Sequence, residues 1–341
     1  MHYKNSYHIL RDECLTEDLS DCNIASPQDS ESARPSDCKT SSPQVRQTAG
    51  PSDTKTASPQ VRKTARPSDR KTASPQDCKT ARPSDSKPLF LLHGLFDCTL
   101  SWKPIADLLS DKFDVHLLSL CNHRDAKRCP TMSFDEMADD VKAYADEHNI
   151  KKFTFVGHSL GGKTAMQFAL KYPQMLEKVV VIDISPCRMN SLLESNPLVT
   201  NLMNQVLAVK SLPLADFHSF AEFANGISTF DDDTKRAIIG NIKYDGKAFS
   251  WQINIDAVFN NFDKLTSGFD VDDFIDRKIN VPTLFIKAMD SEFLPKSDYK
   301  AVKYIFPNSE IVEVPDCTHR IHFEKPKVLA EVIASALRVA L

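Results

Sequence analysis

From residue 88 onward, short apolar segments alternate with longer amphipathic segments. The apolar segments are rich in Val, Ile, Leu and Phe, which is typical of strands buried on both faces of a parallel sheet. The amphipathic segments place apolar residues on one face and acidic residues on the other, so they are predicted to be covering helices. Strict alternation of strand and helix predicts the α/β class. The predicted strands are residues 88–92, 113–120, 153–156, 179–184, 282–290 and 310–314.

The alternation stops between residues 187 and 275, where the pattern is largely helical and contains no strand of comparable strength. An insertion of this size between two strands is predicted to be a cap over the edge of the sheet at which active sites form. Its apolar residues either stabilise a helical subdomain or line a lipophilic pocket under the cap, and the pocket is the sharper hypothesis. The residues expected to line it are Met189, Leu192, Met203, Phe220, Phe223, Phe230 and Phe259.

Residues 1–87 follow a different pattern. Pro-Ser-Asp and Ser-Pro-Gln each recur four times at intervals of 16 residues, in a background of Lys, Arg, Thr, Ser and Ala. Stacked units of this composition would bury little apolar surface and could not offset chain entropy, so we predict a disordered tail. The tail has a basic surplus that could attract acidic partners such as nucleic acid, or a membrane surface. No aromatic residues accompany it in the repeats, so a solvated linker is favoured. The sequence does not identify a partner for it.

Charge and cysteine content narrow the cellular context. Acidic residues within the first 22 positions argue against a secretory signal and against a mitochondrial presequence, and no apolar run is long enough for a transmembrane segment. The nine cysteines are scattered without metal-ligand spacing, which predicts reduced thiols in an intracellular compartment and no metal site. Cys98, Cys121 and Cys187 are expected to fill space.

A sharp turn between a predicted strand and a predicted helix carries the candidate chemistry. Residues 157–161 read Gly-His-Ser-Leu-Gly, the G-x-S-x-G nucleophile elbow, in which a strained turn exposes the hydroxyl of Ser159 above the sheet. The flanking glycines are required because any Cβ there would collide with the neighbouring strand or helix. Residues 157–164 also fit the phosphate-binding loop G-x-x-x-x-G-K-T, and Asp183 ends an apolar strand as a Walker B acid would.

The rest of the chain decides between these two interpretations. His319 falls on the loop after the last strand, where a serine hydrolase of this fold requires its general base. Backbone N–H groups of Leu160 and of Leu95 or Phe96, in the loop after the first strand, would form the oxyanion hole. A phosphate-binding loop has no use for such a histidine, so Ser159 is predicted to be a nucleophile, with no metal and no cofactor.

The acidic partner of His319 stays open at this stage. Asp290 ends the penultimate strand, the usual place in this fold, and Asp183 ends the strand after the elbow helix, which is also within reach of the last loop. Either carboxylate could orient the imidazole. Either residue could instead have a local role, Asp183 as a helix cap and Asp290 in a turn.

Residues 88–341 resemble the abhydrolase-domain-containing protein 11 branch of the α/β-hydrolases. The resemblance implies an α/β-hydrolase fold, carboxylic ester hydrolysis, diacylglycerol-type lipids as small-molecule substrates and a mitochondrial location. It also favours Asp183 as the acid, followed by Asp290 and then Asp256. The strings that carry it are His93-Gly94-Leu95-Phe96, Asn122-His123, Gly157 to Met166, Val181 to Pro186, Asn254-Ile255-Asp256 and Val314 to His319.

Two departures from this branch are visible. The repeats take the place of two edge strands that similar proteins have before the first strand, which predicts a truncated sheet with an exposed edge. Arg124 stands where the branch has glycine in its Asn-His-Gly-Asp loop, so a positive φ at this position would be strained. The leading hypothesis is an ester hydrolase that acts through Ser159, His319 and an aspartate. The alternative is a catalytically silent protein of the same fold that binds a lipid or a protein.

Overall fold

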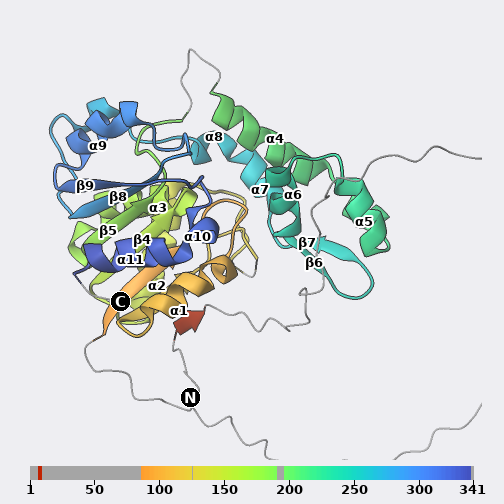
Figure 1. The fold of residues 1–341 in the computed structure, drawn as a ribbon, viewed down its shortest axis with the longest axis horizontal. Coiled ribbons are helices and arrows are strands. Elements are labelled where there is room, and N and C mark those ends of the chain that lie inside the picture. Colours follow the sequence, from red (N-terminus) through yellow and green to blue (C-terminus); the bar gives the residue numbers. More distant parts are fainter. Residues whose placement is uncertain (1–6, 10–85, 125, 190–195, 339–341) are drawn as a thin grey trace, which may run out of the picture. The chain divides into compact units, whose positions relative to one another are not determined.

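A parallel sheet flanked by helices forms the core of the described fold (Figure 1). The computed structural model describes residues 7–9, 86–124, 126–189 and 196–338, so nearly all of the predicted disordered tail lies outside the described residues. The six predicted strands are confirmed, and the strand order is β1-β3-β2-β4-β5-β8-β9. Their bounds are β1 Tyr7–Ile9, β2 Lys87–Leu92, β3 Phe113–Leu118, β4 Phe153–His158, β5 Leu176–Ile182, β8 Thr283–Ala288 and β9 Ser309–Val314.

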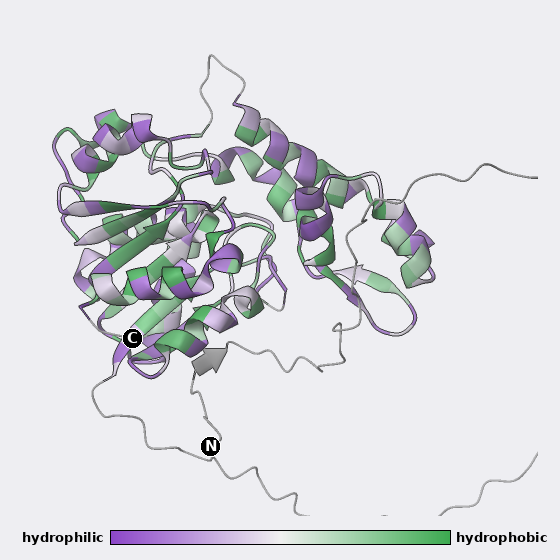
Figure 2. Cartoon of the chain, in the orientation of Figure 1, coloured by the Kyte–Doolittle hydropathy of each residue, from purple (hydrophilic) through white to green (hydrophobic). Residues whose placement is uncertain are grey.

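Helices cover both faces of this sheet because successive side chains of each buried strand point to opposite faces. In β2, Phe90 and Leu92 pack into one hydrophobic core, while Leu89 and Leu91 pack into the other. The helices α1 (Lys103–Leu109), α10 (Ile321–Glu324) and α11 (Pro326–Ala336) contribute to the second core. The helices α2 (Phe134–Glu147), α3 (Leu160–Lys171) and α9 (Tyr299–Ile305) contribute to the first. Figure 2 shows the result, with hydrophobic strands between helices that are hydrophobic on one side.

The edge of the sheet next to β3 differs from the prediction. The sequence predicted that this edge would be exposed, but the three-residue strand β1 pairs with it in parallel, with Tyr7 opposite Val115 and Ile9 opposite Leu117. A strand of three residues is too short for its alternation to be recognised in sequence, and the repeats separate it from the rest of the sheet along the chain.

The segment between β5 and β8 is the predicted insert, and it contains one element that the sequence did not predict. An antiparallel hairpin, β6 Ile242–Tyr244 and β7 Phe249–Trp251, lies among its helices. The overlooked signal is Asp245-Gly246, a common hairpin turn, and Gly246 has φ 91°. The helices of the insert are α4 Pro197–Ser211, α5 Phe220–Ile227, α6 Asp232–Ile239, α7 Ile255–Asn260 and α8 Phe262–Leu265.

Hydrogen bonds tie the insert to loops at the carboxyl ends of β2 and β3. The side-chain amide of Asn241 donates to the carbonyl of Phe96 at 2.9 Å, and the backbone N–H of Asn254 donates to the carbonyl of Asn122 at 2.8 Å. Short 3₁₀ turns complete the described chain at Thr99–Trp102, Pro173–Met175, Leu214–Asp216, Val271–Phe274 and Lys296–Asp298. Among the described residues, no helix has both the length and the apolar composition needed to cross a bilayer.

Candidate active site

Ser159 occupies a strained turn between β4 and α3. Its backbone has φ 52° and ψ −117°, a combination that non-glycine residues rarely adopt. The predicted need for glycine on both sides is confirmed by backbone crowding. A Cβ on Gly157 would lie 2.2 Å from the carbonyl oxygen of Gly161, and a Cβ on Gly161 would lie 2.3 Å from that of Leu92. The turn therefore holds Ser159 at the carboxyl edge of the sheet in one defined orientation.

His319 lies between Ser159 and Asp183. Its Nε2 atom is 2.9 Å from the hydroxyl oxygen of Ser159, and its Nδ1 atom is 2.8 Å from a carboxylate oxygen of Asp183. An ionised carboxylate only accepts hydrogen bonds, so Nδ1 carries the proton and Nε2 is free to accept the hydroxyl proton of Ser159. The ring of Phe293 stacks on the imidazole, with ring centroids 3.7 Å apart, and restricts its rotation.

Asp183 is completely buried directly after β5, and its carboxylate is satisfied by three donors. One oxygen accepts the backbone N–H of Ala288 at 3.0 Å, and the other accepts the hydroxyl of Ser291 as well as the imidazole N–H. Burial of an ionised carboxylate without such partners would cost several kcal/mol. The residue also has φ 49°, so its position is fixed by its surroundings and not by local preference.

The other two candidate acids lie elsewhere. Asp290 has an exposed side chain, and its backbone N–H donates to the carbonyl of Cys317 at 3.0 Å. Asp256 is in α7 of the insert, where its carboxylate is 69% exposed and pairs with Lys210. Of the three acids that the sequence left open, Asp183 is the one whose carboxylate contacts His319.

The residues predicted to hold an oxyanion are the neighbour of Ser159 in the chain and two residues of the loop whose Gly94 lies close to Ser159. Leu160 is the first residue of α3, so its N–H is among the helix-terminal donors that have no intrahelical acceptor. The loop of Leu95 and Phe96 packs against the elbow, because a Cβ added at Gly94 would lie 3.1 Å from the Cβ of Ser159. Phe96 has φ 60°, in the left-handed region that non-glycine residues adopt infrequently.

The competing phosphate-loop interpretation does not fit the contacts. Lys163 is buried, and its ammonium donates to the carbonyls of Pro186 at 3.2 Å and Cys187 at 2.5 Å. Burial lowers the pKa of this amine to about 7. Asp183, which would bind magnesium in a Walker B strand, is occupied by His319 and Ser291. Lys163 therefore anchors the start of the insert.

The loop after β3 is strained at two non-glycine residues. Arg124 has φ 44°, as expected if it occupies a glycine position, and Asn122 has φ 65°. Non-glycine residues in this region cost on the order of 1–3 kcal/mol each. Asn122 is fully buried, and its side-chain oxygen accepts the backbone N–H of Cys129 at 2.9 Å and the amide of Asn254 at 3.0 Å. Asp125 lies outside the described residues.

Three residues near the site were missed by sequence reasoning. Ser291 contacts Asp183 and Phe293 contacts His319, and the signal in the sequence was their place in the loop that follows β8. His158 lies next to Ser159, and its Nε2 atom is 2.8 Å from the carbonyl oxygen of His319. Burial holds the pKa of His158 well below its usual value, so this imidazole is neutral and donates to that carbonyl.

A cavity of about 210 Å³ lies away from Ser159. It is lined by residues of α2, α3 and the start and end of the insert, among them Lys163, Lys264 and Gly268. None of the residues expected to line a lipophilic pocket contributes to it, and Leu192 lies outside the described residues. Phe223 instead stacks on Phe249 inside the insert.

The predicted space-filling cysteines are free thiols. Cys98 and Cys121 are buried, and Cys187 is partly buried. Burial raises the pKa of the Cys121 thiol to about 12, which keeps it protonated and unreactive at neutral pH.

The parallel sheet, the serine at a strand-to-helix elbow and the histidine after the last strand define the class of α/β-hydrolase-fold proteins. A family profile described as "alpha/beta hydrolase fold" matches residues 87–209. A solved structure, "Marine microorganism esterase", is 30% identical and superposes with a TM-score of 0.69 over 74% of this chain and 95% of that chain.

Curated relatives narrow the assignment. The zebrafish (Danio rerio) "sn-1-specific diacylglycerol lipase ABHD11" is 28% identical over 71% of this chain and 75% of its own length. "Abhydrolase domain-containing protein C22H12.03" of Schizosaccharomyces pombe is 29% identical over 73% of this chain and 92% of its own length. The chain belongs to the α/β-hydrolase family, and among curated proteins it is similar to the ABHD11 branch.

Proposed function

We propose that this protein is a serine esterase or lipase that hydrolyses carboxylic esters through Ser159, His319 and Asp183. The observation that carries the proposal is the continuous hydrogen-bond chain from the Ser159 hydroxyl through both nitrogens of His319 to the buried carboxylate of Asp183. A serine hydroxyl is a weak nucleophile unless an adjacent base removes its proton, and this chain supplies that base in the required tautomer.

The first half of the reaction forms an acyl-enzyme. His319 accepts the proton of Ser159 while the serine oxygen attacks the acyl carbonyl, and a tetrahedral oxyanion forms. The N–H groups of Leu160 and of Leu95 or Phe96 stabilise that oxyanion, each contributing on the order of 3 kcal/mol to the transition state. His319 then transfers its proton to the leaving alkoxide, and the alcohol departs.

Water completes the cycle. His319 removes a proton from a water molecule that attacks the acyl-serine. It returns this proton to the Ser159 oxygen as the second tetrahedral intermediate collapses to the carboxylic acid and free Ser159. Asp183 stabilises the imidazolium form of His319 in both halves of the reaction. The donors Ala288 N–H and Ser291 hydroxyl hold its carboxylate in the orientation for that role.

For the substrate, we propose esters with apolar acyl chains, including diacylglycerols. Relatives carry the name "sn-1-specific diacylglycerol lipase", and the insert joined to the loops beside Ser159 is rich in apolar side chains. On the same resemblance we propose a mitochondrial location. Fractionation of cells that express the full chain tests it, and recovery outside the mitochondrial fraction contradicts it.

The test of the enzyme proposal compares the protein with Ser159→Ala. A fluorophosphonate probe should label the parent chain, and p-nitrophenyl esters should be turned over, whereas Ser159→Ala should lose labelling and about 10⁴-fold or more in kcat. Ser211→Ala, a change of an exposed serine in the insert, is the matched control and should behave like the parent. A folded parent chain that shows neither labelling nor turnover would contradict the proposal.

That last outcome would favour the second candidate, a silent hydrolase-fold protein that binds a lipid or protein. The strained Arg124 in the loop after β3 is the observation that favours it, because its positive φ is a backbone conformation that suits glycine. Arg124→Gly separates the two candidates. It should raise turnover if strain limits catalysis, and it should leave a silent protein inactive.

A further inference from the structure

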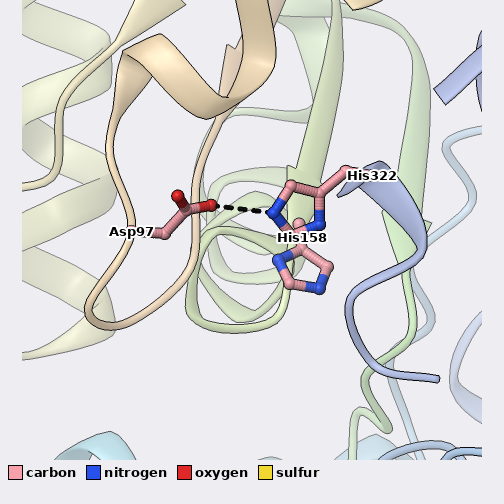
Figure 3. Close-up of side chains that lie close together, drawn as sticks. All are labelled: Asp97, His158 and His322. Carbon is pink, nitrogen blue, oxygen red and sulfur yellow. Dashed lines mark ion pairs between the residues drawn. The ribbon is translucent and has the colours of Figure 1, made fainter. Parts of the chain in front are cut away.

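A second cluster of polar side chains lies beside the proposed nucleophile. Asp97, His158 and His322 come from the loop after β2, the end of β4 and the helix α10, and Figure 3 shows them facing one another. One donor atom from each residue lies within 4.8 Å of the other two. His158 and His322 are buried, with 4% and 3% of their surfaces exposed.

His158 presents a lone pair to this cluster. Its Nε2 atom contacts the carbonyl oxygen of His319 at 2.8 Å, and a carbonyl oxygen can only accept a hydrogen bond. The proton of this neutral imidazole is therefore on Nε2, and Nδ1 carries an unshared electron pair. Nδ1 is buried and has no hydrogen-bond partner among the described residues. An unsatisfied buried acceptor is costly, and a metal ion is one ligand that would satisfy it.

Asp97 and His322 supply the other two donors. The His322 Nε2 atom is 3.1 Å from a carboxylate oxygen of Asp97, yet neither ring nitrogen of His322 has a hydrogen bond of good geometry within the described chain. Trp102 holds both groups in place. Its indole N–H donates to Asp97 at 3.3 Å, and its ring stacks on His322 at a centroid distance of 5.0 Å and an interplanar angle of 5°.

We propose that Asp97, His158 and His322 bind one divalent transition-metal ion of the Zn²⁺ type. Two imidazoles and a carboxylate suit Zn²⁺ and Co²⁺, whereas Mg²⁺ and Ca²⁺ prefer all-oxygen sites. Zinc binds such donors at about 2.0–2.2 Å, so tetrahedral donors lie roughly 3.3 Å apart. The 3.1 Å between His322 and Asp97 already matches this spacing. Three protein donors leave one coordination position for water.

An ion at this location would affect the active site around Ser159; this step rests on the proposed function. The three donors belong to the segments that carry Leu95 and Phe96, Ser159 and His319. An ion would crosslink these segments. Coordination through Nδ1 would also make the Nε2–H of His158 a stronger donor to the carbonyl of His319. The ion would therefore act as a positioning element and would not touch substrate.

The experiment measures metal binding directly on the full chain, so it does not depend on turnover. Metal-free protein is titrated with Zn²⁺ by calorimetry and with Co²⁺ by visible absorption, for the parent chain, Asp97→Asn and His322→Gln. We expect one Co²⁺ per chain in a spectrum without thiolate charge-transfer bands, and at least about tenfold weaker binding in either variant. Asp111→Asn and His218→Gln, which alter exposed residues, are matched controls and should bind as the parent does.

Two outcomes overturn the proposal. One is the absence of saturable binding to the parent chain. The other is equal affinity in all five proteins, which would place the metal elsewhere and leave Asp97 and His322 as a simple ion pair.

Circular dichroism checks that the variants fold. If they do not, anomalous scattering from a Zn²⁺-soaked crystal of the parent decides, since a peak should lie about 2.0–2.2 Å from Nδ1 of His158 and its absence rejects the site. Because Ser159→Ala should retain the metal, failure of the enzyme proposal and failure of this one are distinguishable.

Discussion

The carboxyl edge of the sheet and the insert between β5 and β8 differ in backbone strain and in the side chains that they expose. The edge is strained, since non-glycine residues with positive φ follow four consecutive strands of the chain, at Phe96, Asn122, Arg124, Ser159 and Asp183. In the described part of the insert, residues 196–275, the one positive φ is at Gly246.

The insert differs also in what it leaves exposed. Several of its large apolar side chains reach solvent, among them Leu207, Phe220, Ile239 and Ile275. At the sheet edge, in contrast, polar groups such as Asp183 and Asn122 are buried and bonded. Strain persists only where packing over-determines the backbone, so the edge is where fixed geometry is maintained. The described part of the insert contributes exposed apolar side chains from a backbone without a non-glycine residue at positive φ.

The largest expected effect tests the edge. Asp183→Asn keeps the shape of the side chain but replaces a carboxylate oxygen, which accepts the Nδ1–H of His319, by an amide that can donate to Nδ1. The histidine then adopts the wrong tautomer, so kcat for p-nitrophenyl esters should fall about 10⁴-fold. Asp290→Asn is the matched control, because its side chain is exposed, and should change kcat by less than about tenfold. Equal losses in the two variants would mean that Asp183 is not the acid.

The next effect tests the packing of the insert. Phe223 is 5% exposed and stacks on Phe249 with ring centroids 5.0 Å apart, so Phe223→Ala should lower the free energy of unfolding by about 3–5 kcal/mol. Phe220 is 51% exposed, and Phe220→Ala should cost on the order of 1 kcal/mol. Urea denaturation measures both. If the two variants lost similar stability, the insert would have no well-packed core of its own.

Acid should destabilise the edge through its buried histidines. Burial lowers the pKa of His123 to about 3, and an unfolded histidine titrates near 6.5. Between these values the unfolded chain binds the extra proton, so stability rises with pH and is lost on acidification below about 6.5. The contribution of His123 has a slope of up to about 1.4 kcal/mol per pH unit.

The comparison with a substituted chain isolates that contribution. In His123→Gln, the free energy of unfolding measured by urea between pH 4 and pH 7 should fall less steeply on acidification, by up to about 1.4 kcal/mol per pH unit. His218→Gln changes an exposed histidine of the insert and should leave the slope as in the parent. An unchanged slope in His123→Gln would contradict a neutral, buried imidazole at this position.

The smallest effect belongs to the surface of the insert. The ion pair of Asp256 with Lys210 has a carboxylate that is 69% exposed, so Asp256→Asn should change the free energy of unfolding by less than about 1 kcal/mol. Turnover should stay within about twofold of the parent, because the pair contacts neither Ser159 nor His319. A loss of turnover comparable to that of Asp183→Asn would restore Asp256 as a candidate acid.

The alternation of apolar and amphipathic segments was sufficient to predict six strands of the sheet and their covering helices, because those patterns are local and repeated. The elbow was equally visible, since the turn at Ser159 needs glycine at fixed positions whatever surrounds it. The hairpin β6–β7 and the edge strand β1 were missed because each strand has three residues, too few for a period of two to stand out. His319 was found from its order after the last strand, a topological rule of the fold.

The contact between Asp183 and His319 depends on which strands are neighbours in the sheet and not on chain order. β5 lies beside β8 and β8 lies beside β9, so Asp183, Ser291 and His319 meet although they are far apart in sequence. The same holds for Asp97, His158 and His322, which share no local pattern. Local periodicity and turn chemistry thus determined which elements form and where the elbow turn of Ser159 lies. Which distant polar groups share a hydrogen bond was decided by tertiary packing alone, because those pairings depend on side-chain directions that no single segment specifies.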